Sequence, residues 1–135
     1  MELVRFKNAR ELLSWLDSEI AKTRSTFEEL KSRLESLKRK AEVERRIESL
    51  LREIAGEPRV GRSETRLGEL RILVNPQPVE ELEVLEKLLE ATSLKLQRLE
   101  SARKLLEPLG AVGEEPVVVE LVVEEGAPRN LIIRI

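Results

Sequence analysis

The sequence ARELLSWLDSEIAKTRSTFEELKSRLESLKRKA, residues 9–41, carries the strongest structural signal in the chain. Apolar or small side chains recur in it with alternating steps of four and three residues, at Ala9, Leu13, Leu16, Ile20, Thr23, Phe27, Leu30, Leu34, Leu37 and Ala41. Such a pattern, with a period of about 3.5 residues, keeps an apolar seam facing a partner helix. Asn8 with Glu11 three residues later resembles a capping box, and Ala55-Gly56 marks an end. We therefore predict a helix over residues 8–55.

A second seam follows with the same spacing, at Leu82, Leu85, Leu89, Thr92, Leu96, Leu99 and Leu106. Pro76 and Pro78 exclude helix before it, and Pro108 with Gly110 ends it. The pattern predicts a second helix over residues 79–108. The two helices are expected to pair as a long antiparallel coiled coil zipped by their leucines.

Three segments with alternating apolar residues predict strands. Residues 59–74 form a β-hairpin between the helices, and residues 116–135 form a second hairpin after them. Residues 2–6 are a possible third strand beside that second hairpin. The predicted fold class is therefore α+β, with residues 1–135 forming a single elongated domain.

Extra apolar side chains widen the seams near the start of the first helix and near the end of the second. In an antiparallel pair these two ends coincide, and the predicted strands attach there as well. We expect a sheet patch at this end, and the patch is also the expected surface for contacts with other chains. Its candidate residues are Leu12, Trp15, Leu105, Leu109, Val119, Leu121, Ile133 and Ile135.

Composition argues against several classes of function. The chain has no Cys and no His, which removes disulfides, thiolate or imidazole metal sites and the usual nucleophile–base pairs. We expect neither an enzyme nor a cofactor. The longest apolar run is too short to cross a membrane, and the N-terminus lacks the apolar segment of a signal peptide, which favours a cytoplasmic protein without a membrane partner. Abundant Glu, Arg and Lys with few Asn, Gln and Met is typical of hyperthermophile proteins, including archaeal ones.

The order helix, hairpin, helix is similar to that of the β-type prefoldin subunits. The resemblance covers roughly residues 9–107 and includes the segment Arg-Leu-Gly-Glu-Leu-Arg-Ile-Leu-Val at 66–74, which leads into an acidic second helix. It implies a subunit whose hairpins assemble into a β body from which coiled coils project to hold unfolded polypeptide. The chain departs from that pattern after residue 116, because the predicted second hairpin lies where prefoldin coiled coils have free tips.

Two hypotheses for function follow. The first is a non-catalytic assembly, scaffold or prefoldin-like chaperone protein that self-associates or joins a protein complex and presents a coiled-coil arm. The second is a nucleic-acid-associated coiled coil that binds phosphates through basic side chains of the first helix and of the first hairpin. The candidate phosphate contacts are Lys38, Arg39, Lys40, Arg59, Arg62 and Arg66.

Overall fold

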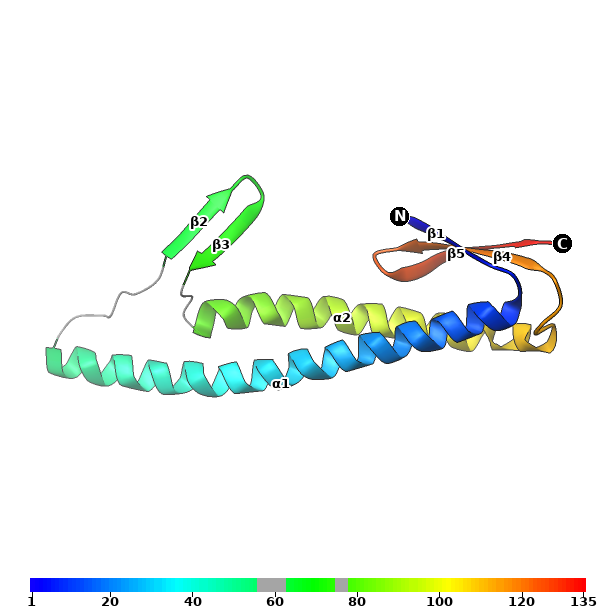
Figure 1. Ribbon diagram of the computed structural model, residues 1–135. Coiled ribbons are helices and arrows are strands. Elements are labelled where there is room, and N and C mark those ends of the chain that lie inside the picture. The colour runs from blue at the N-terminus through cyan, green and yellow to red at the C-terminus, as the bar shows by residue number, and fades with distance from the viewer. Residues whose placement is uncertain (56–62, 75–77) are drawn as a thin grey trace. The chain divides into compact units, whose positions relative to one another are not determined.

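The computed structural model describes residues 1–55, 63–74 and 78–135 (Figure 1). Its elements are β1 (Glu2–Phe6), α1 (Ala9–Ala55), β2 (Ser63–Leu67), β3 (Leu70–Val74), α2 (Pro78–Leu106), the 3-10 helix η1 (Glu107–Ala111), β4 (Val118–Glu124) and β5 (Ala127–Arg134). The α+β fold is confirmed: two long helices pack antiparallel, and β1, β4 and β5 form a three-stranded antiparallel sheet. The N-terminal strand therefore does join the C-terminal hairpin.

Contacts between Cα atoms divide the chain into two compact units. The first unit is Met1–Glu28 with Glu90–Ile135, and the second is Glu29–Leu89. The first contains the sheet with the start of α1 and the end of α2. The second contains the β2–β3 hairpin with the remaining parts of both helices. That both units belong to a single elongated domain stays a prediction.

Side chains just before α1 satisfy backbone groups at its first turn. The Glu11 amide donates to Asn8 Oδ1 at 2.9 Å, so Asn8 is the N-cap. The Glu11 carboxylate in turn accepts a hydrogen bond from the Lys7 amide at 2.9 Å. This arrangement is a capping box in which the carboxylate reaches one residue further back than usual.

Helix α2 ends two residues earlier than predicted, at Leu106 instead of residue 108. A proline disfavours the α conformation in the residue before it, and Pro108 acts here on Glu107. The chain continues as the tighter turn η1, with the proline in its first turn, and then enters β4.

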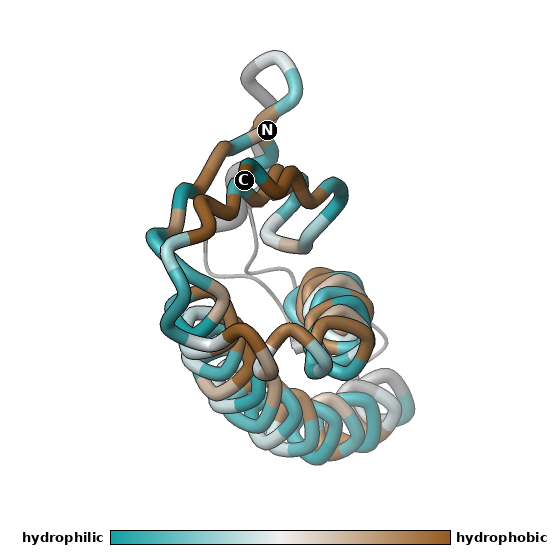
Figure 2. The backbone as a smooth tube through the Cα atoms, turned by 90° about the vertical axis from the view of Figure 1, so that its right-hand side faces the viewer, coloured by the Kyte–Doolittle hydropathy of each residue, from teal (hydrophilic) through white to brown (hydrophobic). Residues whose placement is uncertain are grey.

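The core of the first unit lies between one face of the sheet and the two helices. Its buried side chains are Phe6, Val119, Leu121 and Val123 from the sheet and Leu12, Leu16, Ile20 and Leu99 from the helices. The register places Phe6 opposite Val119 on neighbouring strands, and the rings of Phe6 and Trp15 have centroids 5.9 Å apart. Figure 2 shows how strongly hydrophobic these strands are along most of their length.

The β4–β5 hairpin closes through a two-residue turn at Glu125 and Gly126, whose φ angles are 54° and 76°. Two consecutive positive φ angles define a type I′ turn, which matches the natural twist of paired strands. A bulge between Val122 and Val123 interrupts the pairing near this turn.

The second unit has a smaller core. Leu34 and Leu37 of α1 and Leu85 of α2 are buried, and Leu30, Leu82 and Leu89 pack around them. Taken over both units, every predicted seam residue is buried or half-buried, including the half-buried Leu13, Phe27, Leu96 and Leu106. The hairpin of this unit pairs Leu67 with Leu70 across a turn in which Gly68 has a φ of 62°.

Candidate functional site

The face of the sheet that points away from the helices carries a buried carboxylate. Side chains alternate along a strand, so Val119 and Leu121 point toward the helices and Glu120 points away from them. Glu120 is nevertheless only 3% exposed. Two arginines cover it: Arg134 Nε donates to Glu120 Oε1 at 2.5 Å, and Arg5 Nη2 lies 3.7 Å from Oε2.

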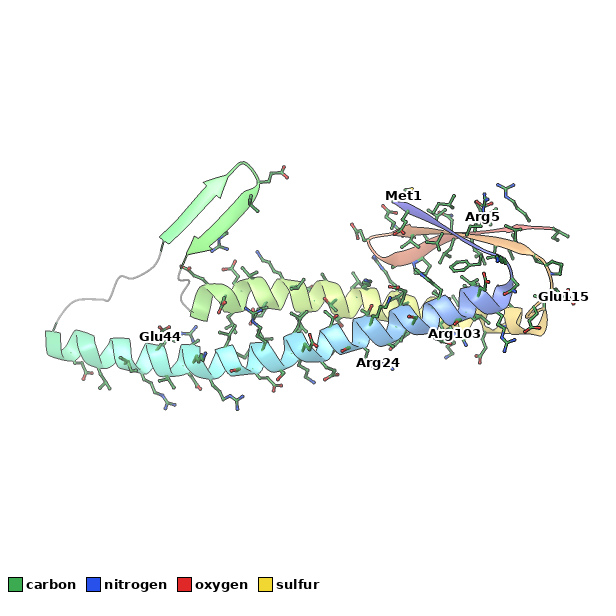
Figure 3. The ribbon with its side chains drawn as sticks, viewed as in Figure 1. Met1, Arg5, Arg24, Glu44, Arg103 and Glu115 are labelled. Carbon is green, nitrogen blue, oxygen red and sulfur yellow. The ribbon has the colours of Figure 1, made fainter. Side chains whose placement is uncertain are left out.

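Three strands contribute one charge each to this group, and the register explains why they meet. Arg5 of β1 stands directly opposite Glu120 of β4, while Arg134 of β5 stands opposite Val118, one diagonal step away. The group carries a net charge of one positive unit, and both guanidinium groups remain largely exposed. Figure 3 labels Arg5 on this side of the first unit.

The surroundings of Glu120 favour its charged form. The hydrogen bond from Arg134 lowers the pKa of the carboxyl from its ordinary value of 4.5, and the positive charges of Arg134 and Arg5 lower it further. Burial opposes this shift, because removal from water penalises the charged form. The carboxylate therefore serves to position two guanidinium groups, not to exchange protons near neutral pH.

Apolar side chains surround this group on the same face. Leu3 of β1, Val118 of β4 and Ile132 of β5 are all partly exposed there, with Ile132 at 39%. Exposed apolar groups gathered on one face of a sheet are typical of a surface that contacts another molecule. The first unit thus presents a sheet face on which exposed apolar side chains lie beside two arginines that share one carboxylate.

Strand β5 forms one free edge of this sheet, because the strand order is β1, β4, β5. Leu131, Ile132 and Ile133, just before its last residue Arg134, place apolar side chains on both faces. Ile133 is 45% exposed although it points to the helix side. The beginning of the strand is different, since Pro128 lies there and Arg129 is the extra residue of the bulge opposite Val122 and Val123. Arg129 also donates to Glu124 at 3.0 Å.

The helix ends of the first unit form a shallow groove of about 460 Å³, lined by Arg10, Asp17, Arg103 and Glu114 among others. Its charges compensate each other. Arg103 Nε donates to Asp17 Oδ1 at 2.7 Å, and Arg10 pairs with Glu114. The bond to Asp17 raises the pKa of Arg103, so that guanidinium stays charged. These groups stabilise the helix ends and leave no net charge in the groove for a ligand.

Ion pairs of the same kind link the two helices elsewhere. Arg24 donates to Glu100 at 2.7 Å in the first unit, and Arg33 lies 3.4 Å from Glu81 in the second. Glu side chains of α2 are therefore the partners of α1 cations at these positions. Exposed pairs of this kind contribute about 0.5 kcal/mol each to the free energy of unfolding. Their main effect is therefore on which residues of the two helices face each other, and they add little to stability.

The structure brings most of the predicted patch residues together. Leu12, Val119 and Leu121 are buried in the core of the first unit, and Trp15 and Leu109 pack against it. Ile133 lies in the edge strand β5 and Ile135 follows the end of that strand, and both are exposed.

The prediction for Leu105 is wrong, because this side chain is 78% exposed. Residues six apart on a helix point about 120° away from each other. With Leu99 facing the core, Leu105 must then turn toward solvent, whereas Leu106 and Leu109 stay on the core side. The apolar stripe of α2 therefore does not include Leu105.

The structure describes the side chains of three of the six candidate phosphate contacts. Lys38, Arg39 and Lys40 are exposed on α1. Arg59 and Arg62 lie outside the described residues, and Arg66 lies in β2 with its side chain also outside them.

Sequence reasoning missed the group formed by Arg5, Glu120 and Arg134. Its signal was present, because Glu120 is the one charged residue within the apolar run of residues 117–123. A charge in the middle of a central strand needs a partner of opposite sign on a neighbouring strand. Finding that partner required the strand order and the register.

In residues 1–55, 63–74 and 78–135, no helix is long and apolar enough to span a membrane. Within the same residues, no three or more Asp or Glu side chains lie close enough together to hold a metal ion. Comparisons with protein-family models, curated proteins and solved structures find no match to this chain. The similarity to prefoldin subunits accordingly stays a prediction.

Proposed function

We propose that the chain is a non-catalytic assembly protein that associates with copies of itself through the sheet of the first unit. In this proposal the two helices form an antiparallel coiled coil, which serves as an arm or spacer held by the assembly. The observation that carries the proposal is the C-terminal half of β5. This edge strand is apolar on both faces and partly exposed at Ile132 and Ile133.

The physical reason is the chemistry of a free strand edge. Such an edge offers unpaired backbone N–H and C=O groups, and isolated chains usually protect it with charges, prolines or bulges. A strand that is apolar on both sides has the composition of a strand inside a sheet. Association would cover both the backbone groups and the isoleucines of β5.

Light scattering after size-exclusion chromatography tests the proposal. We expect a mass that is a multiple of 15.5 kDa and that falls on dilution. Ile133→Lys should lower the mass to that of one chain, because a charge at a pairing edge opposes association. Leu105→Lys is the matched control: it adds the same charge at an exposed leucine outside the sheet, and it should leave the mass unchanged.

Two results would contradict the proposal. One is a wild-type mass of 15.5 kDa at every concentration measured. The other is an equal loss of association in both lysine variants, provided that circular dichroism shows both to be folded.

A prefoldin-like chaperone is a narrower version of the same proposal. It predicts that the assembled protein suppresses aggregation of a denatured client, which light scattering of the client measures over time. Aggregation that continues unchanged at a stoichiometric excess of this protein would exclude the chaperone version and leave self-association in place.

Nucleic-acid contact is the second candidate function, and the consecutive exposed cations Lys38, Arg39 and Lys40 favour it. Binding through phosphates should weaken steeply with salt, because each neutralised phosphate releases counterions. Fluorescence anisotropy with a labelled DNA duplex measures this dependence. Absence of binding at low salt would exclude this candidate.

A further inference from the structure

The two free edges of the sheet in the first unit differ in how they are protected. Strand β1 has five residues, with Glu2 and Arg5 among them and Lys7 just after them. Short length and charged side chains are the usual protection of an edge strand. Strand β5 has eight residues, and its protective features, Pro128 and the bulge at Arg129, lie only at its beginning. The edge that is open to pairing is therefore residues 130–134 of β5.

We infer that β5 pairs antiparallel with β5 of a second copy, around a two-fold axis at Ile132, to give one continuous six-stranded sheet. This inference rests on the self-association proposed above and specifies its edge, direction and register. A two-fold axis makes the same surface of both copies meet itself, which is the commonest arrangement in soluble oligomers. Ile132 then stands opposite Ile132 of the partner subunit on the outer face.

The side chains of β5 complement each other in this register. On the helix side, Leu131 faces the partner subunit's Ile133, so the side chain that is 45% exposed in one chain gains an apolar neighbour. On the outer face, Arg134 faces the partner subunit's Asn130, whose amide oxygen can accept from the guanidinium. No two like charges stand directly opposite each other.

Other arrangements of two copies are less favourable. Parallel pairing in register would place Arg134 beside the partner subunit's Arg134. Stacking of the two outer faces would bring together the groups formed by Arg5, Glu120 and Arg134, each of which is net positive. Like charges in close contact oppose association, so both alternatives carry a penalty that the antiparallel edge pairing avoids.

Edge pairing also limits the size of the assembly formed through this sheet. Once the two β5 strands pair, the outer strands of the joined sheet are the two copies of β1. These are the protected edges, so pairing stops at two copies instead of continuing into a fibre. The inference thus predicts a closed dimer at the sheet.

Cysteine cross-linking tests the register directly, because the chain contains no cysteine of its own. In Ile132→Cys the two thiols would face each other across the axis. Directly opposed residues of antiparallel strands have Cα atoms about 4.5–5.5 Å apart, which lies within the range of a disulfide. Mild oxidation should convert this variant to a covalent dimer on a non-reducing gel, reversed by dithiothreitol. Leu3→Cys is the control, since Leu3 lies on the same face at the other edge and is more exposed.

Each outcome decides between the inference and the broader proposal. Rapid cross-linking of Ile132→Cys with little cross-linking of Leu3→Cys supports the inference. A dimeric mass by light scattering without cross-linking at residue 132 overturns the inference and leaves self-association standing. A monomeric mass overturns both. Equal cross-linking of the two variants indicates random collision and overturns the inference; circular dichroism before oxidation verifies that both variants are folded.

Discussion

Truncating Leu99 should destabilise the protein far more than the same change at Leu105 on the same helix. Leu99 is 0% exposed in the core of the first unit, where both helices meet the sheet. Leucine to alanine removes three carbon groups, each contributing about 0.8 kcal/mol when buried, or about 2.4 kcal/mol together. The cavity left behind raises the expected loss for Leu99→Ala to about 3–4 kcal/mol.

Leu105→Ala should cost about 0.5 kcal/mol, because only about a fifth of the residue is buried and alanine has the higher helix propensity. Urea denaturation followed by circular dichroism measures both values. Both variants are compared at one protein concentration, because association couples stability to concentration. In a thermal scan Leu99→Ala should melt about 10 °C or more below the wild type. Similar losses in the two variants would refute the placement of the core on the Leu99 side of α2.

Three further predictions concern local features of the first unit. Asn8→Ala should cost about 1 kcal/mol in a urea titration, because the Glu11 amide loses its cap, and an unchanged midpoint would contradict the cap. Glu120→Gln should destabilise the protein at pH 7. Since folding lowers the pKa of this carboxyl, its contribution is present above the ordinary value of 4.5 and is lost as the pH falls through the folded value. The difference between Glu120→Gln and wild type, measured by urea titrations at several pH values, should therefore shrink in acid; a constant difference would argue against the ion pair with Arg134. Gly126→Ala should cost about 1 kcal/mol by thermal denaturation, because alanine is strained at a φ of 76°, and no loss would argue against the positive φ.

The helices could be predicted because their signals are local. Spacing of leucines predicts which side of each helix is buried, and Asn8 with Glu11 predicts where the first one begins. The prediction for the end of α2 is two residues too late, because Pro108 disfavours the α conformation in the residue before it. The prediction for Leu105 is wrong because the direction of a side chain depends on its angle around the helix axis, and being apolar and close to a buried residue in sequence does not determine that angle.

The candidate site could be predicted only in part. Alternation along a single strand predicts that Ile133 belongs to an apolar strand face, and it predicts the same for Val119 and Leu121, which lie in the core. The group of Arg5, Glu120 and Arg134 depends on which strands are neighbours and in which register, and the pattern within one strand contains neither. The difference in protection between the β1 edge and the β5 edge could not be predicted for the same reason. Which strands lie at the edges of the sheet depends on the strand order.

The pairing of β1 with β4 has a consequence for how the molecule is made. Phe6 pairs with Val119, and Glu2 pairs with Val123, so the sheet joins segments more than 110 residues apart. During synthesis β1 emerges first and has no sheet partner until β4 has left the ribosome, whereas α1 can form its turns as they emerge. Contacts that span so much of the chain are slow to form, because closing a long loop costs entropy before any contact compensates for it. Until then the apolar side chains of the first unit remain uncovered, which makes this interval the one in which a nascent chain is most exposed to aggregation.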